Sequence, residues 1–173
     1  DHPMARGIAI EGGRLIAENL VTAHQDGRNI QARGRMLIAS TMGATSFQRG
    51  LGAMHALAHS IGGIFDSHHG TLNAILMPYV LISNKRMIEK DIIYLSKCLG
   101  LEETFDAFLN WVLSLRQQLN IPHTLSTLGL SKESAEIIGK TAMRDPSAST
   151  NPIGFNEKDY KKIYLKAVSG DIS

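Results

Sequence analysis

Apolar residues recur along most of the chain every three or four positions, which is the spacing of one face of an α-helix. No segment shows the strict alternation of apolar and polar residues, bounded by turn formers, that is typical of a half-buried strand. The pattern therefore predicts an all-α fold, a helical bundle. The expected helices cover residues 3–24, 30–47, 53–62, 71–82, 87–99, 104–119, 131–143 and 157–168.

Capping and turn-forming residues set the expected limits of these helices. Asn29 is expected to cap the second helix, because its short polar side chain can accept a hydrogen bond from a free N–H of the first turn. Gly62-Gly63 is expected to break the third helix, and residues 66–70 are expected to form a loop. Pro78 lies inside an apolar run that is hydrophobic on nearly all sides, and it should kink or restart that helix.

The length and the charge of the chain narrow the classes of protein to consider. The 173 residues fit one domain, so we expect residues 1–173 to form a single all-helical domain. Lys and Arg number 18 against 16 Asp and Glu, which leaves a formal net charge of +2. This balance gives no electrostatic reason to expect a nucleic acid or an anionic membrane as a partner. No apolar run approaches the roughly 20 residues that a membrane-spanning helix needs.

Cysteine content and the N-terminus bear on the setting of the protein. Cys98 is the only cysteine, which excludes an internal disulfide and a cysteine-rich zinc module. We therefore expect a reducing, cytoplasmic location. The chain begins with Asp1 rather than Met, so we expect a processed chain or a piece of a longer protein.

The candidate chemistry lies in a cluster of four histidines within fifteen residues, at His55, His59, His68 and His69. His55 and His59 are four residues apart and so share one helix face, a spacing that can present two imidazoles to one metal ion. His69, expected in a loop, could supply a third imidazole, and such a set suits zinc or ferrous iron. The alternative interpretation is a coincidental cluster in a semi-polar junction between helices.

The same region carries a family resemblance. The stretch GLGAMHALAHSIGGIFDSHHGTLNAILMPYVLISN, with RLIAENL at 14–20 and AMRDPSASTNP at 142–152, resembles the iron-containing (group III) alcohol dehydrogenases. The fold of this family is shared with dehydroquinate synthase and glycerol dehydrogenase. The resemblance covers essentially the whole chain but only the second half of such an enzyme. It implies an all-helical, C-terminal metal-binding domain, with the N-terminal nucleotide-binding domain absent from this chain.

The resemblance also implies the site residues and the cofactors. The family holds Fe²⁺, or Zn²⁺ in some members, with one Asp and three His. By motif, the metal ligands present here are His55 and His69, whereas His59 would be a catalytic residue that faces the substrate and the nicotinamide. The other two ligands would lie upstream of position 1. His68 stands where many members have Pro, and Ile153 where many have Arg.

The function that the resemblance implies is NAD- or NADP-dependent oxidation of a small alcohol, or reduction of an aldehyde, by the complete protein. A homodimer is a common arrangement in the family. The alternative is a truncated, non-catalytic helical module that carries a partial metal site.

Overall fold

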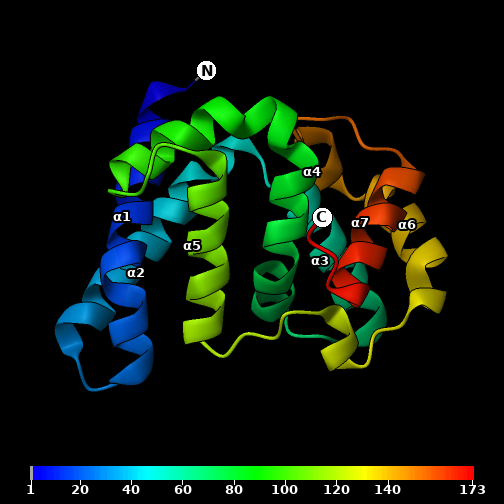
Figure 1. Ribbon diagram of the computed structural model, residues 1–173, viewed down its shortest axis with the longest axis horizontal. Coiled ribbons are helices and arrows are strands. Elements are labelled where there is room, and N and C mark those ends of the chain that lie inside the picture. Colours follow the sequence, from blue (N-terminus) through cyan, green and yellow to red (C-terminus); the bar gives the residue numbers. More distant parts are fainter. Residues whose placement is uncertain (1) are drawn as a thin grey trace. The chain divides into compact units, whose positions relative to one another are not determined.

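The computed structural model describes residues 2–173, and every regular element in that range is a helix (Figure 1). The predicted all-α class is therefore confirmed for the described part of the chain. The α-helices are α1 (Pro3–Gln25), α2 (Ile30–Ser46), α3 (Gly52–Phe65), α4 (His69–Cys98), α5 (Phe105–Gln118), α6 (Ala135–Arg144) and α7 (Glu157–Ser169). The short 3-10 helices are η1 (Phe47–Arg49), η2 (Leu125–Leu128), η3 (Lys132–Ser134) and η4 (Pro146–Thr150).

The chain divides into two compact units. The first contains the described residues up to 49 together with residues 90–111, and the second contains residues 50–89 and 112–173. Helices α4 and α5 each contribute one part to each unit. All the histidines of the predicted site belong to the second unit. The expectation that residues 1–173 form one domain stays a prediction.

In the first unit, α1 and α2 lie side by side as a helical hairpin (Figure 1). Asn29 caps α2 as expected, because its side-chain oxygen accepts a hydrogen bond from the Ala32 N–H at 2.9 Å. The two helices approach closely at Gly12, where a Cβ atom would lie 3.3 Å from the Cβ of Met42. Small residues at this contact therefore set the spacing of the hairpin.

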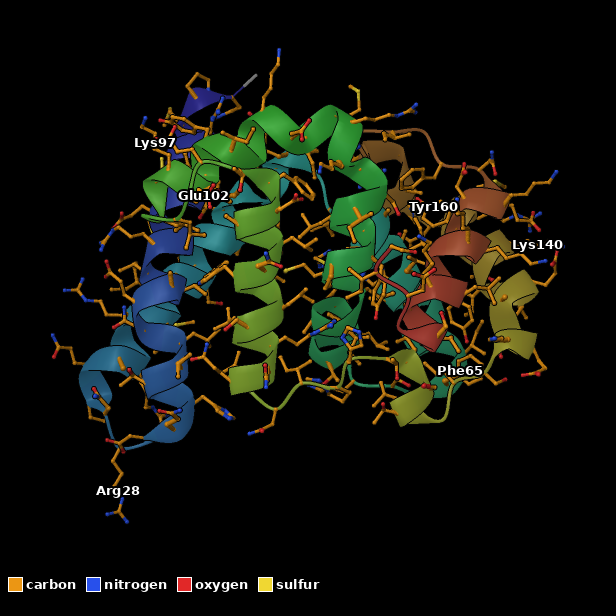
Figure 2. The ribbon with its side chains drawn as sticks, in the orientation of Figure 1. Arg28, Phe65, Lys97, Glu102, Lys140 and Tyr160 are labelled. Carbon is orange, nitrogen blue, oxygen red and sulfur yellow. The ribbon has the colours of Figure 1, made fainter. Side chains whose placement is uncertain are left out.

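In the second unit, α3 packs against α6 and η4, and α6 packs against α7. The apolar faces of these helices and the first half of α4 form one continuous core. Its largest fully buried members include Leu57, Ile61, Leu72, Ile75, Leu76, Tyr79, Ile138, Tyr160 and Tyr164. Tyr160, on α7, is among the residues marked in Figure 2. Burial of these side chains is the main force that fixes the position of α3.

The expected break of the third helix at Gly62-Gly63 is wrong. Gly62 and Gly63 lie inside α3, which continues to Phe65 and ends where Asp66 adopts the left-handed conformation with φ of 52°. Each glycine costs a helix only about 1 kcal/mol relative to alanine, so the buried face of α3 outweighs both. Pro78 was expected to kink or restart its helix; it lies within the continuous 30-residue α4, so of these two effects the restart is not observed.

The expected separation of residues 71–82 from residues 87–99 is also wrong, because α4 continues from the first range into the second. Asn84 lies inside α4, is 4% exposed and pairs with the side chain of Asn151. A polar residue in that position therefore holds the helix to a neighbouring segment instead of ending it.

None of the helices within residues 2–173 combines the length and the apolar character that crossing a membrane requires.

Candidate metal centre

Helix α3 presents His55 and His59 on adjacent turns, and α4 begins with His69, which lies opposite them. The ring centroids of His55 and His59 are 5.7 Å apart, those of His55 and His69 are 5.3 Å apart, and those of His59 and His69 are 5.2 Å apart. The structure thus brings together three of the four histidines singled out from the sequence. His69 is the first residue of a helix and does not belong to a loop, which corrects the expectation for residues 66–70.

His68, the fourth histidine of the cluster, has a different position. Its Nδ1 accepts a hydrogen bond from the Thr71 N–H at 3.3 Å and lies 3.1 Å from the Thr71 hydroxyl oxygen. This is the bonding of a helix cap, since it satisfies a free N–H in the first turn of α4. His68 therefore helps to begin the helix that carries His69.

The electrostatic environment of the cluster favours neutral imidazole at His55. Partial burial lowers the pKa of His55, and the neighbouring imidazoles of His69 and His59 lower it further. A hydrogen bond with the Leu51 backbone and the charge of Asp145 act in the opposite direction but are weaker. Neutral imidazole is the form that binds a metal ion, so burial favours the form of His55 that could act as a nitrogen ligand.

His59 contacts a residue from a distant part of the chain. Its Nδ1 lies 3.1 Å from Oδ2 of Asp145, which follows α6. The other carboxylate oxygen, Oδ1, accepts a hydrogen bond from the Ser147 N–H at 2.8 Å. The Asp145 side chain is 14% exposed and that of His59 is 39% exposed. Spacing could not reveal this partner, although Asp145 lies in the RDPSASTNP stretch that carries part of the resemblance.

His69 is held by a residue of its own helix. The side-chain nitrogen of Asn73 lies 2.8 Å from the Nε2 of His69, one turn further along α4. The amide donates to the imidazole, so Nε2 carries the lone pair and Nδ1 carries the proton. A metal ion would bind through the same lone pair and replace the amide as its partner.

The first turn of α3 is held by side chains of residues 150 and 151. Thr150 Oγ1 accepts hydrogen bonds from the N–H groups of Leu51 and Gly52, each at 3.1 Å. Asn151 Oδ1 accepts one from the Ala53 N–H, also at 3.1 Å. These side chains supply the acceptors that a helix N-terminus lacks within its own backbone. The cap fixes the end of α3 from which His55 projects.

Close approach of the same segment explains the glycine at position 50. Gly50 has φ of 94°, in the left-handed region that favours glycine, and a Cβ there would lie 2.2 Å from the Cβ of Thr150. Any larger residue would push Thr150 away from the α3 N-terminus. The first glycine of GLGA, Gly50, is thus required for Thr150 to cap α3.

The separations of the histidines fit metal ligation. Two imidazoles bound to one tetrahedral ion, each through a bond of about 2.1 Å, have ring centroids about 5 Å apart. All three measured separations are close to that value, so the centroids alone do not decide which two histidines would be ligands. Within residues 2–173, no group of three or more His, Cys, Asp or Glu residues could hold a metal ion by itself.

Comparison with known proteins identifies the family. The family model described as "Fe-containing alcohol dehydrogenase family, C-terminal" matches residues 1–168. Alcohol dehydrogenase 4 of Saccharomyces cerevisiae is 34% identical over 174 residues, which cover 96% of this chain and 44% of the yeast protein. The 1,3-propanediol dehydrogenase of Citrobacter freundii is 32% identical over 174 residues, with 96% of this chain and 45% of that protein covered.

Solved structures agree with the sequence comparison. The crystal structure of a 1,3-propanediol oxidoreductase superposes with a TM-score of 0.93 at 30% identity, and covers 96% of this chain and 46% of that one. An iron-containing alcohol dehydrogenase from Thermococcus thioreducens gives a TM-score of 0.89 at 26% identity, with 98% and 45% covered. The chain spans less than half the length of these relatives. It belongs to the iron-containing alcohol dehydrogenase family and has the all-helical fold of that family's C-terminal domain.

Proposed function

We propose that this chain is the metal-binding, substrate-side part of a nicotinamide-dependent alcohol dehydrogenase. The observation that carries the proposal is the convergence of three imidazoles within one unit, at centroid separations of 5.2–5.7 Å. In the complete protein, His55 and His69 would bind Fe²⁺, with Zn²⁺ as the other candidate ion. The remaining ligands would come from residues outside this chain, since ions of this type have three or four protein ligands.

The residues of this chain would hold the site and handle a proton. His55, whose pKa is lowered by burial, and His69, with its Nε2 lone pair facing Asn73, would offer one nitrogen each to the metal. His59 would face the substrate and accept or relay the proton released by the alcohol, because imidazole exchanges protons near neutral pH. When bound, the metal would polarise the alcohol oxygen as a Lewis acid and the nicotinamide would accept the hydride.

The proposed substrate class is based on the names of the relatives. Their names include alcohol, 1,3-propanediol, butanol and methanol dehydrogenases, so we propose a small alcohol or the corresponding aldehyde as the substrate. NAD or NADP would be bound by a domain outside residues 1–173. We further propose that the complete protein is a homodimer in the cytoplasm. We propose neither a nucleic acid nor a membrane as its partner.

The direct test is turnover by the complete protein, purified without oxygen and supplied with Fe²⁺ or Zn²⁺. With ethanol, 1-butanol or 1,3-propanediol present, we expect reduction of NAD⁺ or NADP⁺ that a chelator abolishes and added metal restores. Absorbance of the reduced nicotinamide measures the rate. A protein that retains metal but turns over none of these alcohols, and reduces none of the matching aldehydes, would favour the alternative of a non-catalytic helical module.

A further inference from the structure

Residues 145–151 contact the histidine-bearing helix α3 at two separate places. Thr150 and Asn151 cap its N-terminus, and Asp145 contacts His59 two turns further along. The contact residues are 86 to 99 positions apart in the sequence. The same segment therefore sets both the position of α3 and the direction of one of its imidazoles.

The Asp145 carboxylate can only accept hydrogen bonds, whereas a neutral imidazole carries one proton that can sit on either nitrogen. At 3.1 Å from Oδ2, the Nδ1 of His59 must therefore be the nitrogen that carries the proton. The lone pair is then on Nε2, the nitrogen on the far side of the ring. The hydrogen bond from Nδ1 to the carboxylate thus determines that, in the neutral ring, Nε2 has no proton and can accept a hydrogen bond.

The carboxylate is itself held in place. Its Oδ1 accepts the Ser147 N–H at 2.8 Å, and the backbone N–H of Asp145 donates to the Ala142 carbonyl at 3.2 Å. Only Oδ2 is directed at His59, and the Asp145 side chain is 14% exposed, so the carboxylate end of this contact is largely shielded from water. The Ser147 N–H therefore orients the carboxylate, and the Asp145 backbone is fixed separately, so Oδ2 stays directed at one nitrogen of His59.

We propose that Asp145 is a positioning residue for His59: it holds the imidazole as the Nδ1–H tautomer, so that Nε2 is free to accept a proton. The effect of Asp145 on the reaction rests on the proposed function, in which His59 faces the alcohol. Its effect on His59 itself does not, because the hydrogen bond lies within this chain. In this role Asp145 acts through His59 and needs no contact with substrate or cofactor.

Asp145→Asn is the sharpest test, because the Ser147 N–H determines how the new amide is oriented. The amide oxygen takes the place of Oδ1, which leaves the amide N–H groups directed at His59. Nδ1 must then accept, and the proton moves to Nε2. The matched control is Thr150→Val, which removes the α3 cap bonds and the bond from the Thr150 hydroxyl to the Ser147 carbonyl but keeps the Asp145 side chain itself.

The first readout is ¹⁵N NMR of the 173-residue chain at a pH of about 8.5, where imidazole is neutral. We expect the Nδ1–H tautomer of His59 in the unmodified chain and in Thr150→Val, and the Nε2–H tautomer in Asp145→Asn. The proposal is overturned if the unmodified chain already has the proton on Nε2, or if Asp145→Asn leaves the tautomer unchanged.

The second readout is the kinetics of the metal-loaded complete protein. We expect Asp145→Asn to lower kcat about a hundredfold, within the range that a positioned acid–base group contributes, while KM for the alcohol changes by less than about threefold. A normal kcat together with a shifted tautomer would overturn the role in the reaction. If the unmodified complete protein has no dehydrogenase activity, the proposed function fails, and the NMR result still decides whether Asp145 positions His59.

Discussion

Three tyrosines of the second unit are buried, but their hydroxyl groups differ in hydrogen bonding. Tyr79 donates to the His123 carbonyl and Tyr164 donates to the Ser131 carbonyl, at 2.8 and 2.9 Å. The Tyr160 hydroxyl is fully buried and has no hydrogen-bond partner among the described residues. Burial raises the pKa of Tyr160 to about 12. An unsatisfied buried hydroxyl lowers stability, because water is lost and nothing replaces it.

Removing the Tyr160 hydroxyl should therefore not destabilise the protein. We expect Tyr160→Phe to leave the free energy of unfolding unchanged or to raise it by up to about 1 kcal/mol. Tyr164→Phe, the matched control, should lower it by about 1 kcal/mol, because it leaves the Ser131 carbonyl without its donor. Urea unfolding of the 173-residue chain measures both. A loss in Tyr160→Phe as large as that in Tyr164→Phe would contradict this account.

At the scale of single residues, local spacing predicted the histidine cluster and could not predict its partners. His55, His59 and His69 are close in sequence, so the same few turns of chain bring them together. Asp145 is 86 residues from His59, and only the packed fold makes them neighbours. The ligand roles given to His55 and His69, and the catalytic role given to His59, stay predictions.

Two glycines inside helices of the second unit have opposite surroundings. Gly139, on α6, faces α7, and a Cβ there would lie 2.8 Å from the Glu157 carbonyl oxygen and 3.2 Å from the Cβ of Lys161. Gly63, on α3, has nothing within 4 Å of the same position. The first glycine therefore allows two helices to approach, whereas the second only adds flexibility to the unfolded chain.

Alanine substitution should separate these two roles. We expect Gly139→Ala to lower the free energy of unfolding by about 1–3 kcal/mol, because α6 and α7 must move apart. Gly63→Ala should raise it by about 0.5–1 kcal/mol, since alanine favours the helix at no steric cost. Thermal unfolding followed by circular dichroism measures both. Equal effects of the two variants would show that the close α6–α7 approach does not depend on Gly139.

At the scale of the elements, helices with regular patterns were predicted well and their interruptions were not. The limits expected for residues 3–24, 104–119 and 157–168 agree with α1, α5 and α7 to within one residue at each end. Gly62-Gly63 was expected to end a helix and residues 83–86 to separate two helices, but burial of the surrounding face stabilises α3 and α4 across them. Residue type indicates only the local preference for ending a helix, and tertiary packing can outweigh that preference.

At the scale of the whole molecule, the quoted motifs predicted the fold because they extend over nearly the entire chain. Residues 1–168 match the family model, and the TM-score of 0.93 confirms the all-helical C-terminal domain. Substrate and nicotinamide specificity could not be predicted in the same way. The chain spans 44–46% of the relatives compared, and these 173 residues carry no motif from which specificity for substrate or nicotinamide could be predicted.

The central claim is that His55 and His69 bind the metal and that His59 does not. The most direct measurement is the metal content, by mass spectrometry, of the complete protein and its His55→Ala, His59→Ala and His69→Ala variants after gel filtration. We expect His55→Ala and His69→Ala to lose most of the metal, because removing a ligand costs more than the roughly 10–100-fold in affinity lost with an outer-shell partner. His59→Ala should retain the metal. Loss of metal in His59→Ala with retention in His69→Ala would contradict the claim and identify His55 and His59, the pair suggested by their spacing, as the ligands.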